Sequence, residues 1–159
     1  MFARVNSLGT FGMEVFPVTM LQAILDGAQV INCSFGFGVN TDNWTADELL
    51  FADAIKTAYE KNIFIVASAG NSGNASYEPN YTLPASSNVV LTISASNIYS
   101  YPCAWSSRGK CVDICAPGES VPAIGLEGYE EADGTSFSAP IVSAVCAMML
   151  SFNSDLKVE

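Results

Sequence analysis

The sequence has 159 residues, of which 50% are hydrophobic and 14% charged, and its net charge is −10 with six basic residues. This length fits one domain and is too short for two ordinary ones, so residues 1–159 are interpreted as a single domain. The scattered basic residues exclude a nucleic-acid-binding patch. No apolar run reaches roughly 18–20 residues, which predicts no membrane span. The apolar excess indicates a surface that something outside these residues covers.

Helices and strands are predicted to alternate along the chain. The expected elements are helices over 18–28, 46–62 and 136–152, buried strands over 30–36, 63–71 and 89–96, and loops over 72–88 and 117–134. Gly27 weakens the last turn of the first helix and fits a stop. Thr45 and Glu48 form a capping-box pattern at the start of the second helix, and Asn62 is a plausible end for it.

A hairpin is predicted in the segment CAWSSRGKCVDIC. Its strands would be 104–107 and 112–115, with the turn around Gly109. That turn would place Cys103 and Cys115 on the same side of the two strands. The pattern therefore allows a disulfide between them and equally allows free thiols, while the odd total of five cysteines leaves at least one unpaired.

Strands buried on both faces and separated by helices predict an α/β layer fold with a mostly parallel sheet flanked by helices. In such folds ligands gather beyond the carboxyl ends of the strands. The residues expected there are Ser34, Phe35 and Gly36, then Ala67, Ser68, Ala69, Gly70 and Asn71, and finally the loop leading to Ser136. Glycine at positions 36 and 70 would let a substrate backbone approach the chain closely.

Two of these residues point to a particular chemistry. Ser136 opens an apolar helix, where free N–H groups and the helix dipole favour negative charge. Asn71 carries an amide donor at a strand end, and two such donors aimed at one point form an oxyanion hole. Each residue also has a simpler interpretation, Ser136 as a helix N-cap and Asn71 as a turn residue. The chain contains no histidine that could take a proton from the serine.

Four segments together resemble the subtilisin-like serine peptidases (subtilases), in that family's order and at compatible spacing. They are DGAQVINCSFG, NIFIVASAGNSG, WSSRGKCVDICAPG and ADGTSFSAPIVSAVCAMML. The resemblance implies a three-layer subtilisin-like fold, endopeptidase activity on peptide or protein substrates, and an extracellular location. It also implies that Ser136 is the nucleophile and Asn71 the oxyanion-hole amide. Residues 34–36 would pair with the substrate backbone, and 67–70 would form the other wall of the S1 pocket.

The main departure from the family concerns the other two catalytic residues. Subtilases carry them in the order Asp, His, Ser, and the segments with Asp and His precede the region that this chain matches. We therefore expect an upstream segment of the same protein to supply both, and the N-terminal portion of the fold to be missing here. A serine hydroxyl is a poor nucleophile without a neighbouring base, so the isolated chain is predicted to be inactive. Pro140 is expected in the first turn of the last helix, where proline is tolerated.

Two other functions fit parts of the sequence. A non-catalytic module could hold extended peptides by strand addition, although it has no need for both Ser136 and Asn71. A nucleotide-binding α/β domain needs a Gly-rich phosphate loop, and neither G-x-G-x-x-G nor a Walker pattern occurs.

No cofactor ligands can be named from the sequence. The cysteines lack paired C-x-x-C spacing and there is no histidine, so no transition-metal site is predicted. Many subtilases bind calcium, yet the acidic residues weighed as ligands fit helix capping and a solvated face better than a calcium cage. These are Asp42, Asp47, Glu48 and Asp53. Sequons at Asn43, Asn74 and Asn80 fit a secreted glycoprotein and fit chance equally well.

Overall fold

The computed structural model describes residues 14–73, 81–125 and 128–158. The elements within these ranges are α1 (Val15–Leu25), β1 (Val30–Cys33), β2 (Phe37–Val39), α2 (Ala46–Glu60), β3 (Phe64–Ser68), β4 (Tyr81–Leu83), β5 (Leu91–Ser96), β6 (Ile114–Pro117), β7 (Val121–Gly125), β8 (Gly128–Ala132) and α3 (Thr135–Phe152).

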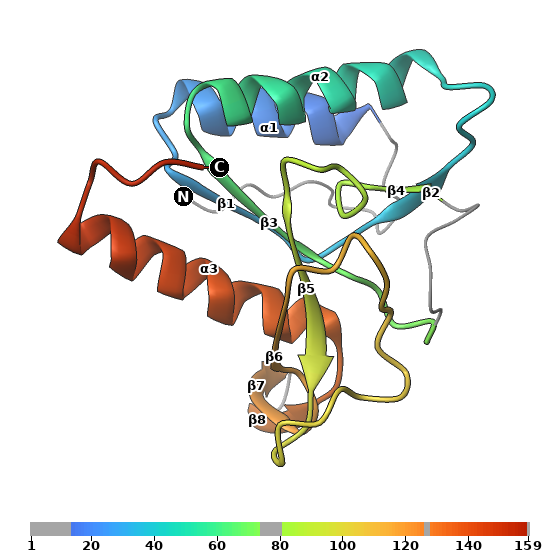
Figure 1. Cartoon of the computed structure of the whole chain (residues 1–159), viewed down its shortest axis with the longest axis vertical. Coiled ribbons are helices and arrows are strands. Elements are labelled where there is room, and N and C mark those ends of the chain that lie inside the picture. Colours follow the sequence, from blue (N-terminus) through green and yellow to red (C-terminus); the bar gives the residue numbers. More distant parts are fainter. Residues whose placement is uncertain (1–13, 74–80, 126–127, 159) are drawn as a thin grey trace.

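A parallel four-stranded sheet with the strand order β1-β3-β5-β6 forms the middle layer. Helices α1 and α2 cover one face of this sheet and α3 covers the other, which gives three layers (Figure 1). The predicted α/β fold with a mostly parallel sheet is therefore confirmed. Because the four strands run in the same direction, their carboxyl ends lie at one edge of the sheet, where α3 also begins.

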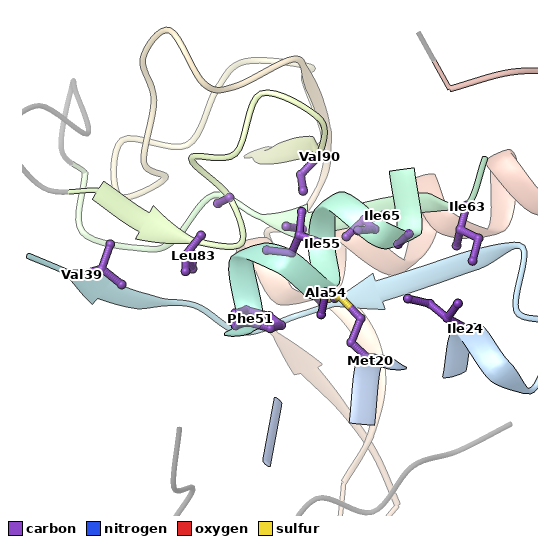
Figure 2. Close-up of a cluster of buried hydrophobic side chains, with 14 residues drawn as sticks. Met20, Ile24, Val39, Phe51, Ala54, Ile55, Ile63, Ile65, Leu83 and Val90 are labelled. Carbon is purple, nitrogen blue, oxygen red and sulfur yellow. The ribbon is translucent and has the colours of Figure 1, made fainter. Parts of the chain in front are cut away.

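Apolar side chains fill the space on both faces of the sheet. Under α1 and α2, Phe51 and Ile65 are at most 1% exposed and belong to one cluster (Figure 2). On the other face, Val66 and Ile93 pack with Cys146 of α3. Neighbouring residues of a strand point to opposite faces, so β3 needs apolar side chains at successive positions. This explains the continuous apolar run that predicted it.

The helix ends follow the signals in the sequence. The capping box is present, since Glu48 N donates to Thr45 Oγ1 (3.3 Å) and Thr45 N donates to Glu48 Oε2 (2.6 Å). Asn62 follows the end of α2 with a φ of +60°. Helix α1 begins and ends three residues earlier than predicted, and Gly27 lies just beyond it with a φ of +80°.

Two antiparallel strand pairs lie outside the central sheet, and the sequence did not predict them. β2 pairs with β4, and β7 pairs with β8. β2 and β4 have three residues each, too few to show a periodic pattern. The β7–β8 hairpin is largely exposed, so burial does not impose on it the alternation of apolar and polar residues that identifies a strand.

The predicted hairpin over 103–115 is wrong. β6 runs parallel to β5 with Cys115 opposite Ser94, whereas Cys103 N donates to Ala95 O (2.9 Å). Successive residues of a strand direct their backbone groups to opposite sides, so Cys103 and Cys115 lie on the two flanks of β5. Both thiols are free.

Helix α3 has 18 residues with a mean hydropathy of 1.6, which by length and composition is enough to cross a membrane. The sequence analysis expected no apolar segment of this length. The expectation was based on uninterrupted apolar runs, whereas α3 also contains serine and threonine residues. These residues carry no charge and lower the mean hydropathy of the helix only slightly. This is weak evidence for a span, since a core helix meets the same criterion, and α3 packs against β1, β3 and β5.

Alkylation of the native chain with iodoacetamide at about pH 8 is expected to modify Cys115 first. This side chain is exposed, whereas burial raises the pKa of Cys33 to about 12 and also raises the pKa of Cys146. Burial also raises the pKa of Cys103, so all three buried thiols hold little of the reactive thiolate at this pH. Peptide mass mapping checks the order, with all five cysteines modified in denaturant as the control. A native disulfide between Cys103 and Cys115 would leave Cys115 unmodified and would contradict the structure.

Candidate active site

Three segments meet at the carboxyl ends of β1 and β3, where α3 begins. Ser34 follows β1, Asn71 follows β3, and Ser136 is the second residue of α3. Hydrogen bonds join Ser34 to Ser136, and others join Asn71 to Thr135. The structure therefore brings together the three segments that the sequence analysis singled out, from positions up to 102 residues apart.

Thr135 joins the end of β3 to the start of α3. Its backbone N–H donates to Asn71 Oδ1 (3.0 Å), and its Oγ1 donates to the same oxygen (2.9 Å). Gly70 N in turn donates to Thr135 Oγ1 (3.1 Å). Thr135 is only 1% exposed, so water competes little for these bonds. The sequence analysis gave Thr135 no role; its only signal is its place directly before the serine in the first turn of the helix.

These bonds determine the orientation of the Asn71 amide. Of the two ends of an amide side chain, only the oxygen can accept a hydrogen bond from a backbone N–H. Oδ1 therefore faces Thr135, and Nδ2, which carries two N–H donors, faces away from it. A Cβ added to Gly134 would lie 3.5 Å from Nδ2. The amide nitrogen thus lies beside the chain that enters α3, two residues before Ser136.

The interpretation of Ser136 as the helix N-cap is wrong, because Gly134 has that position. The Ser136 side chain is half-buried, and its Oγ donates to Ser34 O (3.2 Å). A peptide carbonyl accepts this hydrogen bond, but it does not act as a base near neutral pH. The contact therefore does not activate the hydroxyl as a nucleophile.

The proline within α3 accounts for a second bond between the helix and the end of β1. Pro140 is the sixth residue of α3, not part of the first turn as predicted, because the helix begins at Thr135. It lacks the N–H that would donate to the carbonyl of Ser136, four residues earlier. Ser34 Oγ donates to this carbonyl instead (2.8 Å), and Asn32 Nδ2 donates to Ser34 Oγ (2.9 Å).

The candidates for substrate binding differ in how they are placed. Phe35 stacks on Phe16, with ring centroids 4.4 Å apart. Ala67 is completely buried in the apolar cluster under α1 and α2. Ser68 is 7% exposed and Ala69 is 2% exposed. The role of these residues in holding a substrate stays a prediction.

Gly36 and Gly70 both lie close to other parts of the protein. A Cβ at Gly36 would lie 3.1 Å from Thr82 Cγ2, so β2 and β4 could not pair as closely with a larger residue there. Gly70 has a φ of +98°, and a Cβ on it would lie 3.2 Å from Ser107 Oγ. At Gly70 the positive φ favours glycine, whereas at Gly36 a larger residue would need Thr82 to move by a few tenths of an ångström. Close approach of a substrate backbone stays a prediction.

A hollow of about 270 Å³ opens beside Asn71 and is lined by Asn71, Trp105 and Asp133. Hydrogen bonds hold its walls, since Gly73 N donates to Trp105 O (2.8 Å) and Ser120 N donates to the carboxylate oxygen Asp133 Oδ1 (2.7 Å). The sequence analysis did not identify Trp105 or Asp133. Their segments lie 28 residues apart and meet only through the tertiary structure.

Calcium ligands cannot be assigned in the part of the chain that the structure describes. No three His, Cys, Asp or Glu side chains there lie close enough together to hold a metal ion. Glu48, one of the acidic residues weighed as a ligand, is used in the capping box of α2.

Comparison with known proteins identifies the family. The Subtilase family pattern matches residues 2–159, and the chain belongs to this family. It is 30% identical to a minor extracellular protease of Bacillus subtilis over 81% of this chain and 20% of that protein. It is also 30% identical to a probable subtilase-type serine protease of Deinococcus radiodurans, over 97% of this chain and 22% of that protein.

The fold agrees with this assignment. The solved structure of the patellamide maturation protease PatA matches with a TM-score of 0.81 and 27% identity, covering 94% of this chain and 54% of that one. The resemblance inferred from the sequence motifs is thus confirmed, together with the subtilisin-like α/β fold. The chain spans about a fifth of the length of the two relatives and about half of the solved chain.

Thr135→Val is expected to lower the free energy of unfolding by about 1–3 kcal/mol. The substitution keeps the side-chain shape but leaves the Gly70 N–H without its acceptor and removes one donor from Asn71. Urea denaturation followed by circular dichroism measures the change. The matched control is Thr57→Val, which removes an exposed bond to Asp53 O (2.8 Å) and is expected to change stability by no more than about 0.5 kcal/mol. Equal losses in the two variants would contradict the role given to Thr135.

Proposed function

We propose that this chain is the nucleophile-bearing part of the catalytic domain of a serine endopeptidase. In this proposal Ser136 Oγ attacks the carbonyl carbon of a scissile peptide bond, and its proton passes to a histidine that lies outside these residues. The C–N bond then breaks, the leaving amine takes up that proton, and water hydrolyses the acyl-enzyme. The observation that carries the proposal is the bonding of Thr135 to Asn71, which leaves the Asn71 amide N–H groups beside the start of α3.

Asn71 Nδ2 and the backbone N–H of Ser136 are the proposed oxyanion donors. The Ser136 N–H lies in the first turn of α3, where donors have no acceptor within the helix, and the helix dipole there favours negative charge. Removing one donor of this kind, the asparagine of subtilisin, costs about 10²–10³ in kcat. In the proposal these donors stabilise the tetrahedral intermediate, whereas its formation needs a base.

The base and its aspartate are proposed to come from a segment outside the 159 residues. The chain contains no histidine, and the Ser136 hydroxyl donates to a carbonyl that cannot act as a base. In subtilisin, loss of the catalytic histidine lowers kcat by about 10⁶. The isolated chain is therefore predicted to have negligible peptidase activity.

An exposed apolar face of α3 supports this proposal. The face contains Ile141, Val145, Met148 and Phe152, which are 38%, 43%, 54% and 92% exposed. They recur at helical spacing along one side of the helix that begins with the nucleophile. A protein segment covering this face would remove apolar area from water, at about 25 cal/mol for each Å². We infer that the segment carrying the base packs here.

The proposed substrate is an extended stretch of a peptide or protein. Residues 34–36 are proposed to pair with its backbone, and residues 67–70 to form the other wall of the S1 pocket. The proposed location is outside the cell, because one of the relatives is an extracellular protease. The sequon at Asn43 lies on an exposed residue, while those at Asn74 and Asn80 lie outside the described residues.

Labelling with a fluorophosphonate probe is expected to be slow for the isolated chain and fast after the base is supplied. The base can be supplied by co-expressing the chain with the Asp- and His-bearing segment of a related subtilase. Intact-mass measurement follows the adduct, and peptide mapping locates it at Ser136. Rapid, stoichiometric labelling of the isolated chain would contradict an external base.

Two variants make this experiment specific. Ser136→Ala is expected to abolish labelling of the complemented protein, whereas Ser143→Ala, on the same helix, should be labelled at the unaltered rate. Val145→Asp should prevent complementation, because it places a charge in the exposed apolar face. If a complemented protein binds peptides but never labels, the non-catalytic peptide-binding module is the correct function.

A further inference from the structure

We propose that the hollow lined by Asn71, Trp105 and Asp133 binds a cationic side chain of the substrate, lysine or arginine. This inference rests on the proposed function, because it takes a peptide as the ligand. It adds a specificity that the nucleophile and the oxyanion donors do not supply.

Asp133 provides an unpaired negative charge at the hollow. Its Oδ1 accepts from Ser120 N (2.7 Å), which fixes the carboxylate and engages one of its two oxygens. Within the described residues the only ion pair joins Lys56 to Glu60, so no cation of the protein neutralises Asp133 there. A positively charged ligand would make a charge-assisted hydrogen bond with this carboxylate. The net charge of −10 would also attract it.

Trp105 provides the second feature that favours a cation. An indole ring attracts ammonium and guanidinium groups to its face, more strongly than the other aromatic rings do. Backbone bonds from Gly73 N to Trp105 O (2.8 Å) and from Ser107 N to Gly70 O (2.9 Å) hold this loop against the end of β3. Arg108, three residues further on, donates to Ala104 O (2.9 Å), so its guanidinium is engaged with backbone.

The position of the hollow relates this cation to the scissile bond. Asn71 lines the hollow and also carries the proposed oxyanion donor. A substrate whose scissile carbonyl meets Asn71 Nδ2 would therefore place a neighbouring side chain within reach of Asp133. The volume of about 270 Å³ is below the roughly 300–1,000 Å³ of small-molecule sites. It suits one side chain better than a whole ligand.

Blocked tetrapeptides that differ at one position test the inference on the chain as it is. The probes are Ala-Ala-Arg-Ala and Ala-Ala-Gln-Ala, and the readout is the ¹⁵N–¹H signal of the Trp105 indole during titration, with Trp44 as the internal reference. The arginine peptide is expected to shift the Trp105 signal and to bind about tenfold more tightly than the glutamine peptide. Raising the salt concentration should reduce this ratio.

Asp133→Asn is expected to bring the ratio of the two affinities to about one, because asparagine keeps an oxygen for Ser120 N but loses the charge. The matched control is Glu131→Gln, which removes the same charge from an exposed position on β8 and should keep the tenfold ratio. Equal binding of the two peptides, or no binding at about 10 mM, would overturn the inference. Labelling of Ser136 in the complemented protein tests the peptidase proposal separately. A failure of the cation-binding inference can therefore be told from a failure of the peptidase proposal.

Discussion

The contact between Thr135 and Asn71 is the interaction on which the candidate site depends. It joins the carboxyl end of β3 to the first turn of α3 and does so through a side chain that is almost completely buried. Because Thr135 supplies two donors to Asn71 Oδ1, the amide nitrogen of Asn71 has its own donors available. The same helix turn carries Ser136. One buried threonine thereby sets the position of the Asn71 amide relative to Ser136, the two residues to which the proposed chemistry is assigned.

The connection between α3 and β1 follows the same principle. Pro140 removes one hydrogen bond from the helix, and the carbonyl of Ser136 accepts from Ser34 Oγ instead. The backbone of Ser136 is thus held from the β1 side as its neighbour Thr135 is held from the β3 side. The outer face of α3, in contrast, exposes apolar side chains along its length. Ser136 is therefore held from both sides, while the exposed face of α3 is the surface on which the proposed base-bearing segment would pack.

The sequence predicted the features that depend on local pattern. The capping box at Thr45 and the apolar run of β3 have local causes and are found as expected. The predicted hairpin over 103–115 failed because residues 104–107 form no strand and bond instead to the loop after β3, while β6 pairs in parallel with β5. No local signal specifies a parallel partner. The hollow was missed for a related reason. Trp105 and Asp133 come from separate loops, and neither loop has a motif that indicates the other.

A double-mutant cycle between Asn71→Ala and Thr135→Val measures the central interaction most directly. It needs neither a base-bearing segment nor a substrate, since urea denaturation of the chain gives the free energy of unfolding for the wild type, both single variants and the double variant. The account predicts a coupling energy of at least about 1 kcal/mol, because either substitution alone removes the bond from Thr135 Oγ1 to Asn71 Oδ1. Effects that add to within about 0.3–0.5 kcal/mol would show that the two residues act independently and would contradict the account.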